Sequence, residues 1–255
     1  MAELKKKIKR PYVLSIAGFD PCGGAGVLAD IKTFESFKTI GLGVSTCITY
    51  QHEDVFEGVD WLTSDQIIKQ AEILFSRYKI DFVKIGLIKD FDTLEFVCSY
   101  LLKQNPAIKI IWDPILKASA GFDFHKDISA KRLMEICGKL FLITPNLNEI
   151  MAIFPGKKND EGAGELSKSC NVLLKGGHSS ERKGYDMLFH KNKIQTFRPK
   201  LVTNIEKHGS GCVLSAAILA GLAREKHLPR AVMDARDYIY KFLISSNTKL
   251  GLHKF

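Results

Sequence analysis

The stretch that decides the fold is Tyr12-Val13-Leu14-Ser15-Ile16-Ala17, followed by Gly18-Phe19-Asp20-Pro21-Cys22-Gly23-Gly24-Ala25-Gly26. The first six residues form a short apolar run that is typical of a central β-strand. The glycine-rich segment predicts a tight turn, and the apolar stripe after it predicts a helix to about Phe37, with Leu28, Ile31 and Phe34 on one face. The turn is neither a P-loop nor a dinucleotide fingerprint, because Gly-Lys-Ser/Thr and the GxGxxG spacing are both missing. Its glycines would let a ligand approach the backbone closely.

Strand and helix signals continue to alternate along the chain. Further short apolar strands are predicted at residues 43–50, 82–87, 109–112, 140–143 and 171–174. Continuous apolar strands indicate a mainly parallel sheet with helices on both faces, an α/β fold whose ligands gather at the C-terminal strand ends. The residues predicted at such ends are Gly18, Gln51, Gly86, Asp113 and Asn146. The last third of the chain departs from this strand–helix alternation, since Tyr185–Phe189 and Lys193–Phe197 predict an antiparallel hairpin.

Helix starts can also be read from the sequence. Thr63-Ser64-Asp65-Gln66 is typical of a capping box, so a helix is expected to begin there and run to about Tyr78. Asp92 is expected to cap the next helix, and a further helix is expected near Ile128–Cys137. A short helix is expected at Glu165–Ser169, and a last, amphipathic one at Arg230–Asn247.

A second glycine-rich stretch, His208-Gly209-Ser210-Gly211-Cys212, precedes a run of small residues with helical character. A helix that starts from such a turn offers unpaired N–H groups and the positive end of its dipole, which together suit a phosphate or a phosphoryl transition state. Cys212 would lie at the mouth of this anion hole, where a helix N-terminus lowers a cysteine pKa. The alternative is a plain tight turn with Cys212 as a small buried residue.

Composition restricts the class of protein. With 255 residues, 45% of them hydrophobic and 25% charged, the chain is expected to form a single globular domain over residues 1–255. The net charge of +9 is scattered apart from Lys5–Arg10, so residues 1–10 are expected to be a flexible basic arm rather than a nucleic-acid site. No apolar stretch is long enough to span a bilayer, and six cysteines without a CxxC pair indicate a reducing, cytoplasmic location.

In this order and spacing, the motifs resemble the hydroxymethylpyrimidine/phosphomethylpyrimidine kinase family of thiamine biosynthesis, within the ribokinase-like superfamily. The remaining motifs are Ala29–Phe34, Lys84–Leu87, Thr144–Glu149 and Leu174–His178. The resemblance implies a three-layer α/β/α fold with a small β-hairpin element, and a homodimer. It also implies that ATP phosphorylates 4-amino-5-hydroxymethyl-2-methylpyrimidine and then its monophosphate, with Mg²⁺ as cofactor.

For the chemistry, the resemblance implies that the backbone N–H groups of Gly209, Ser210 and Gly211 hold the charge on the transferred phosphoryl group, with Cys212 as general base. Asn146, Glu149 and Asp113 would organise Mg²⁺, often through waters, and oxygen ligands suit this cation. Each has a structural alternative: Asn146 could cap a helix, and Asp113 could close a strand-end turn.

For the ligands, the resemblance implies that Gln51 reads the aminopyrimidine edge, since an amide offers a donor and an acceptor together. The other substrate positions would be Gly18, Ala25, Asp30, Leu87 and Ile115. ATP would meet Lys175, Gly176 and Asn146. The alternatives are an exposed loop amide for Gln51, a solvated helix residue for Asp30 and a solvated loop lysine for Lys175.

The chain departs from the family pattern in three places. Tyr50, His52 and Glu53 are bulkier or more polar than the usual neighbours of Gln51, so the pocket lid is expected to differ. Ala118-Ser119-Ala120-Gly121 lacks a lysine that is frequent there, and Cys22 replaces a usual serine.

Two other functions stay open from the sequence alone. A pyridoxal kinase of vitamin B6 salvage shares the fold and the chemistry. A non-catalytic module on the same fold, binding a ligand or nucleic acid, is opposed by the anion hole and the Asn146/Glu149 pair.

Overall fold

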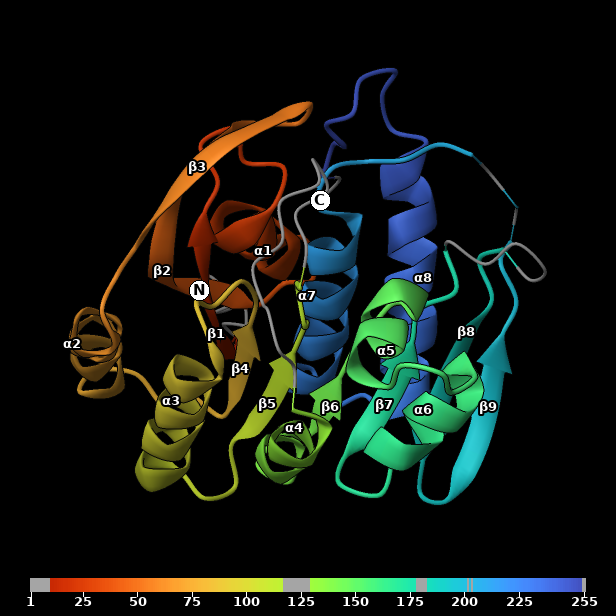
Figure 1. Cartoon of the computed structure of the whole chain (residues 1–255). Helices are drawn as coiled ribbons and strands as arrows, with labels where there is room; N and C mark the ends of the chain where they lie inside the picture. Colours follow the sequence, from red (N-terminus) through yellow and green to blue (C-terminus); the bar gives the residue numbers. More distant parts are fainter. Residues whose placement is uncertain (1–9, 117–128, 178–182, 201, 203, 254–255) are drawn as a thin grey trace, which may run out of the picture.

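A computed structural model describes residues 10–116, 129–177, 183–200, 202 and 204–253. Within these ranges one nine-stranded sheet has the order β3-β2-β1-β4-β5-β6-β7-β8-β9 (Figure 1). Its strands are β1 (Tyr12–Phe19), β2 (Ile40–His52), β3 (Val55–Trp61), β4 (Phe82–Ile85), β5 (Lys109–Trp112), β6 (Leu142–Ile143), β7 (Asn171–Leu174), β8 (Asp186–His190) and β9 (Lys193–Phe197). The helices are α1 (Gly26–Ser36), α2 (Ser64–Phe75), α3 (Phe91–Gln104), α4 (Ala130–Cys137), α5 (Leu147–Ile153), α6 (Asn159–Leu166), α7 (Ser210–Ala223) and α8 (Leu228–Leu243).

The centre of the sheet is parallel and its two margins are antiparallel. β1 pairs in parallel with both β2 and β4, and the parallel pairing continues through β5 and β6 to β7. β3, β8 and β9 run antiparallel to their neighbours. The chain leaves β1 toward β2 and returns on its other side as β4, so the C-terminal ends of β1 and β4 flank a topological switch point, where α/β sheets bind ligands.

Helices cover both faces, as the alternation predicted. One core cluster packs α2 to α6 against the sheet and includes Ile67, Leu94, Leu133 and Trp112. A second packs α1, α7 and α8 on the opposite face. α7 is buried along almost its whole length, because its small residues Ala216, Ala217 and Ala220 let neighbouring elements approach closely. The predicted three-layer α/β/α architecture is confirmed (Figure 1).

Most element predictions are confirmed, with shifts at helix ends. Thr63 and Gln66 form the predicted capping box of α2. The cap of α3 is Asp90 rather than Asp92, because the Asp90 carboxylate accepts the N–H of Thr93. α6 begins at Asn159, earlier than the predicted helix at Glu165.

The strand β3 was not predicted from the sequence. Its seven residues are exposed or half-buried, so it lacks the apolar run that marks a buried strand. It pairs only with β2, at the margin of the sheet. The departures at Ala118–Gly121 and the basic residues Lys5–Lys9 lie outside the described residues. Among the helices of the described ranges, none is both long and apolar enough to cross a bilayer.

Candidate functional site

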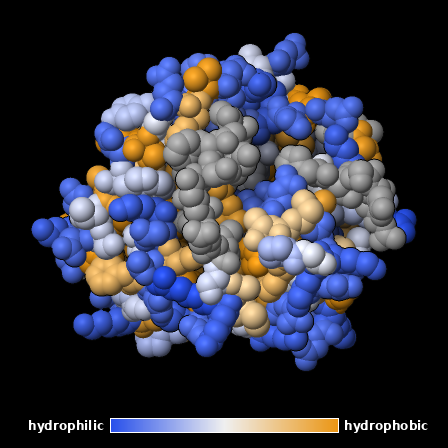
Figure 2. Space-filling model, in the orientation of Figure 1, coloured by the Kyte–Doolittle hydropathy of each residue, from blue (hydrophilic) through white to orange (hydrophobic). Residues whose placement is uncertain are grey.

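A cavity of about 1110 Å³ opens at the C-terminal ends of the central strands. Residues from the ends of β1, β2, β4 and β5 line one side, and the N-terminus of α7 forms the middle of its wall. On the face seen in Figure 2, polar residues cover most of the surface, with small apolar groups between them. The cavity exceeds the usual size for one small ligand, so it has room for two substrates side by side.

Within the stretch His208–Cys212 the chain forms the predicted tight turn, and a helix begins directly after this turn at Ser210. Gly209 caps α7 with φ 73° and ψ 12°, in the left-handed region that favours glycine. A Cβ on Gly209 would lie 2.0 Å from the carbonyl oxygen of Gly24, so no other residue fits there. Ser210 donates its N–H to Lys207, while those of Gly211 and Cys212 have no backbone acceptor in the described part of the chain. They are free to bind an anion.

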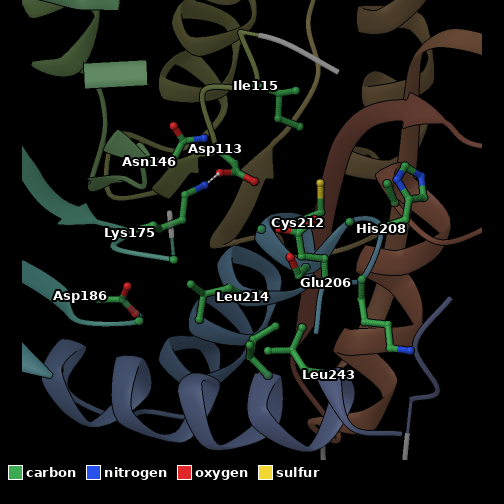
Figure 3. Close-up of a pocket in the computed structure, with 18 of the residues that line it drawn as sticks. Asp113, Ile115, Asn146, Lys175, Asp186, Glu206, His208, Cys212, Leu214 and Leu243 are labelled. Carbon is green, nitrogen blue, oxygen red and sulfur yellow. Dashed lines mark hydrogen bonds and ion pairs between the residues drawn. The ribbon is translucent and has the colours of Figure 1, made fainter. Parts of the chain in front are cut away.

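Cys212 lies where the N-terminal ends of two helices meet. It is the third residue of α7, and the N–H of Gly26, the first residue of α1, donates a hydrogen bond to its sulfur. The side chain points toward the cavity from α7 (Figure 3). Both dipoles therefore present their positive ends to this thiol.

The expected low pKa of Cys212 is not found. Cys212 is only 6% exposed, and burial raises the pKa of its thiol to about 11. The charge of Lys84 and the Gly26 N–H lower that pKa, while Asp113 and Asp30 raise it further. With this pKa roughly one thiol in ten thousand is ionised at neutral pH in the free protein. Cys212 is therefore a protonated thiol before substrates bind.

Asp113 and Lys175 form the polar floor of the cavity. The Lys175 ammonium lies 2.7 Å from Asp113 Oδ1, which also accepts the hydroxyl of Thr144, and Ser215 donates to Oδ2 (Figure 3). Burial raises the pKa of Asp113, but the charges of Lys175 and Lys84 outweigh it and hold that pKa below its ordinary value. Asp113 thus stays ionised, and Lys175 stays charged beside it.

Asn146 and Glu149 form a capping box at the start of α5. The Asn146 side chain accepts the N–H of Glu149, and the Glu149 carboxylate accepts that of Asn146 at 2.6 Å. The structural alternative for Asn146 is thus present, and both residues also line the cavity. Burial raises the pKa of Glu149 to about 7; the Lys175 charge lowers it and that of Asp113 raises it.

Five predicted substrate positions line the far end of the cavity: Gly18, Ala25, Gln51, Leu87 and Ile115. Gly18 lies close to its neighbours, because a Cβ there would be 2.8 Å from Cys47 Sγ and 3.3 Å from Leu87. Thr49 and Gln51 near the end of β2 line the cavity, and so does Glu53 in the turn that follows the strand.

Comparison with known proteins agrees with this geometry. Residues 20–254 match the family described as phosphomethylpyrimidine kinase. This chain belongs to the phosphomethylpyrimidine kinase family. It is 30% identical over 250 residues to the hydroxymethylpyrimidine/phosphomethylpyrimidine kinase of Escherichia coli (strain K12), covering 94% of both chains. It is 33% identical to that of Staphylococcus aureus (strain MRSA252), covering 91% of this chain and 87% of the relative.

Solved structures share the fold. The phosphomethylpyrimidine kinase of Clostridium difficile 630 has a TM-score of 0.76 and 29% identity, with 91% of this chain and 99% of that chain covered. A pyridoxal kinase from Staphylococcus aureus reaches a TM-score of 0.81 at 24% identity, which shows a shared fold. As a member of this kinase family, the protein is a phosphotransferase.

Two predicted ligand positions of this kinase lie outside the cavity lining. Asp30 is fully buried behind it, where its carboxylate accepts Lys84 Nζ at 2.8 Å and Ser15 Oγ at 2.6 Å. This burial corrects the predicted substrate contact of Asp30, and it also excludes the solvated alternative. Gly176 donates its N–H to Asp186 and lies against the carbonyl of Tyr185, so it shapes the turn after β7, and Gly177 lines the cavity instead.

Two of the three departures around Gln51 lie outside the cavity lining. Tyr50 is half-exposed, does not line the cavity and donates its hydroxyl to Asp60 on β3. His52 also lies outside the lining. Of the three unusual neighbours, Glu53 alone contributes a side chain to the cavity wall.

Sequence reasoning missed two polar contacts of the cavity. His208 Nε2 lies 2.9 Å from Asp20 Oδ2 and ties the loop after β1 to the loop before α7. Asp186 forms an ion pair with Arg236 of α8. Both pairs join segments far apart in sequence, so spacing alone carried no signal for them.

The donors at Asp113, Asn146 and Glu149 fit a hard divalent cation. All three offer oxygen, and the raised pKa of Glu149 shows a buried carboxyl whose charge is incompletely compensated. Asp113 Oδ1 is already paired with the Lys175 ammonium. Asp113 Oδ2 and the Glu149 carboxylate would therefore contact the cation through water molecules.

Proposed function

We propose that the protein uses ATP to phosphorylate 4-amino-5-hydroxymethyl-2-methylpyrimidine and then its monophosphate, giving the pyrophosphate for thiamine biosynthesis. The observation that carries this proposal is the cavity. The Gln51 amide lies at one end of it, and the N-terminus of α7 with Cys212 lies in the middle of its wall. The family assignment supports it, because the relatives with about 30% identity bear the name of this kinase.

The pyrimidine is proposed to lie at the end lined by Gln51, Leu87 and Ile115. Gln51 can accept from the exocyclic amino group and donate to the adjacent ring nitrogen. Leu87 and Ile115 supply apolar surface for the ring faces. This placement directs the hydroxymethyl group toward Cys212.

Cys212 is proposed to act as its thiolate: the thiol first releases its proton to solvent in the open cavity, and the thiolate then accepts the proton of the attacking hydroxyl. In a loose phosphoryl-transfer transition state little proton transfer is needed before the phosphoryl group arrives, so a base can act late. The hydrogen bond from Gly26 and the two helix N-termini favour the thiolate at the moment of transfer. The N–H groups of Gly211 and Cys212 would hold the charge on the phosphoryl oxygens.

The nucleotide is proposed to occupy the opposite end. There the cavity wall includes apolar side chains from the loop before α7, from α7 and from α8, and these offer a surface suited to a planar base: Val202, Leu214, Met233, Ile239 and Leu243. Lys175 would provide a point charge for the phosphates. When bound, Mg²⁺ held by Asn146, Glu149 and Asp113 would neutralise phosphate charge. A homodimer and a cytoplasmic location complete the proposal, both on the strength of the family.

The test is to incubate the protein with ATP, Mg²⁺ and the hydroxymethylpyrimidine, and to resolve monophosphate and pyrophosphate products by mass. We expect both products, with a higher kcat/KM for the pyrimidine than for pyridoxal. A higher value for pyridoxal would replace the proposal with pyridoxal kinase. No turnover of either substrate would favour the non-catalytic module.

Cys212→Ala tests the base. It should fold, since only one buried sulfur is lost, and it should still bind ATP. Turnover should fall by about 100-fold or more, the usual contribution of a general base. Near wild-type turnover would remove Cys212 from this role.

A further inference from the structure

A cluster of three different ligand types borders the cavity; Asp20 and His208 line it and Cys22 lies behind them, and none of the three has a role in the proposed chemistry. Asp20, Cys22 and His208 each offer one ligand atom, and these atoms all lie within 4.8 Å of one another. Asp20 Oδ2 is 2.9 Å from His208 Nε2 and 3.3 Å from Cys22 Sγ. A carboxylate, a thiol and an imidazole are the ligands that zinc takes in proteins.

From this cluster we infer that the kinase has a second cation site, in which Asp20, Cys22 and His208 bind Zn²⁺ or a related borderline divalent metal. The inference goes beyond the proposed function and does not depend on which substrate is phosphorylated. Such a site with three protein ligands leaves a fourth position for water.

The distances fit such an ion with small adjustments. Zinc bond lengths of about 2.0–2.3 Å place tetrahedral ligand atoms about 3.4–3.6 Å apart. The two measured separations from Asp20 Oδ2, 2.9 and 3.3 Å, are therefore short by half an ångström or less. Rotation of the Cys22 and His208 side chains can open them, while the Asp20 carboxylate stays bound to the backbone N–H groups of Cys22 and Ala25.

The ligands are also held in place before any ion binds. Asp20 and Cys22 belong to one tight turn, in which the Gly23 N–H bonds the Asp20 carbonyl and the Cys22 N–H bonds Asp20 Oδ1. Asp20 is 1% exposed, and the His208 side chain is 9% exposed. His208 comes from the other loop and lies on the far side of Cys212 from Asn146 and Lys175 (Figure 3).

The protons can be accounted for. Without an ion, His208 Nε2 lies 2.9 Å from Asp20 Oδ2, and Nδ1 has no partner among the described residues. As a ligand the imidazole binds the metal through Nε2 and carries its proton on Nδ1, while the Cys22 thiol releases its proton to solvent.

The ion would bridge two loops that carry the chemistry. Cys22 lies three residues before Ala25, and His208 directly precedes Gly209, the cap of α7. The loops already pack tightly, since a Cβ on Gly24 would lie 2.6 Å from the His208 ring. Bridging them would hold the anion hole in one geometry, so we expect Zn²⁺ to inhibit turnover.

Cys22→Ser provides the decisive variant. Cys22 does not line the cavity, and serine can keep the hydrogen bond to Asp20, so basal activity should be unchanged. Cys170→Ser is the matched control, because Cys170 is the other partly exposed cysteine among the described residues. Cys22→Ala serves as a second variant if the serine disturbs the turn. Equal melting temperatures establish that each variant is folded.

Co²⁺ is the binding probe, read by its thiolate charge-transfer absorption, and Zn²⁺ is the inhibitor in the kinase assay. We expect the absorption in wild type and Cys170→Ser but not in Cys22→Ser. The Zn²⁺ concentration for half-inhibition should rise at least about tenfold in Cys22→Ser. The absence of thiolate absorption in wild type would overturn the inference. So would equal Zn²⁺ inhibition of wild type and Cys22→Ser, because the ion would then act at Asn146 and Glu149. The Co²⁺ measurement needs no turnover, so failure of the proposed function leaves it valid.

Discussion

The ion pair between Lys84 and Asp30 gives the sharpest energetic prediction. Both side chains are fully buried, with Nζ 2.8 Å from Oδ2. Burial lowers the pKa of Lys84, but the charge of Asp30 outweighs this and keeps that pKa above its ordinary value, so the lysine is charged. Lys84→Met removes this charge and leaves a buried carboxylate whose remaining hydrogen bond comes from Ser15, while its Oδ1 has no partner among the described residues.

The expected cost follows from leaving one charge buried alone. Breaking such a pair from one side costs about 3–5 kcal/mol of unfolding free energy. For a chain of this size, each kcal/mol lowers Tm by about 2–4 °C, so Tm should fall by about 6–20 °C. Asp30→Asn combined with Lys84→Met removes both charges and keeps an acceptor for Ser15. The double variant should recover about 2 kcal/mol or more relative to Lys84→Met.

Urea unfolding measures these free energies, provided that the slope m is equal in all variants. Lys168→Met is the matched control, because its pair with Glu165 has the same 2.8 Å separation while Lys168 is 66% exposed. That variant should cost less than about 1 kcal/mol. The reasoning is refuted if Lys84→Met costs no more than Lys168→Met, or if the double variant is as unstable as the sum of the single ones.

Three further variants test other parts of the site. Between about pH 4.5 and 7 the Glu149 carboxyl is protonated in the folded protein but ionised in the unfolded chain, so stability falls as pH rises through that window. Glu149→Gln removes this group, so by urea unfolding the variant should be more stable than wild type by about 3 kcal/mol at pH 8 and equally stable at pH 4. The same variant should need more Mg²⁺ for half-maximal turnover, and an unchanged requirement would remove Glu149 from the cation site. Gly209→Ala places a Cβ 2.0 Å from the carbonyl oxygen of Gly24, at a residue with positive φ. The variant should lose at least about 2 kcal/mol of unfolding free energy and about 100-fold in kcat. Full activity would contradict the role of this turn as an anion hole. Tyr50→Phe should leave KM for the pyrimidine unchanged in steady-state kinetics, since the hydroxyl faces Asp60, and a several-fold rise would show that Tyr50 contacts the substrate.

The strand ends could be predicted from sequence because each depends on local signals. An apolar run followed by a polar or glycine residue was enough to locate Gly18, Gln51 and Asp113 at one edge of the sheet. The hairpin β8–β9 and the capping box of α2 followed from similar short patterns. β3 gave no such signal, since both of its faces reach solvent at least in part.

The remaining features depend on what surrounds a residue in three dimensions. The helix N-terminus at Cys212 favours a low pKa, but packing against α1 buries the thiol, and burial dominates. Asp30 stands in a motif shared with substrate-binding positions, yet the register of β1 beside β4 sets Ser15 opposite Lys84 and draws the carboxylate inward. Neither the burial of Cys212 nor the inward position of Asp30 can be predicted from residue spacing.

The contact between Asp20 and His208 has a consequence for the order in which the parts of the enzyme fold. The two residues are 188 positions apart in the chain. During synthesis from the N-terminus, the strand ends of the sheet exist long before α7, and such distant contacts form late because closing a long loop costs entropy. The pocket is thus completed last. A nascent chain halted before residue 208 would carry Gln51 and Asp113 without the glycine cradle or the thiol. Recovery of turnover in a refolding experiment should therefore trail the recovery of helical signal.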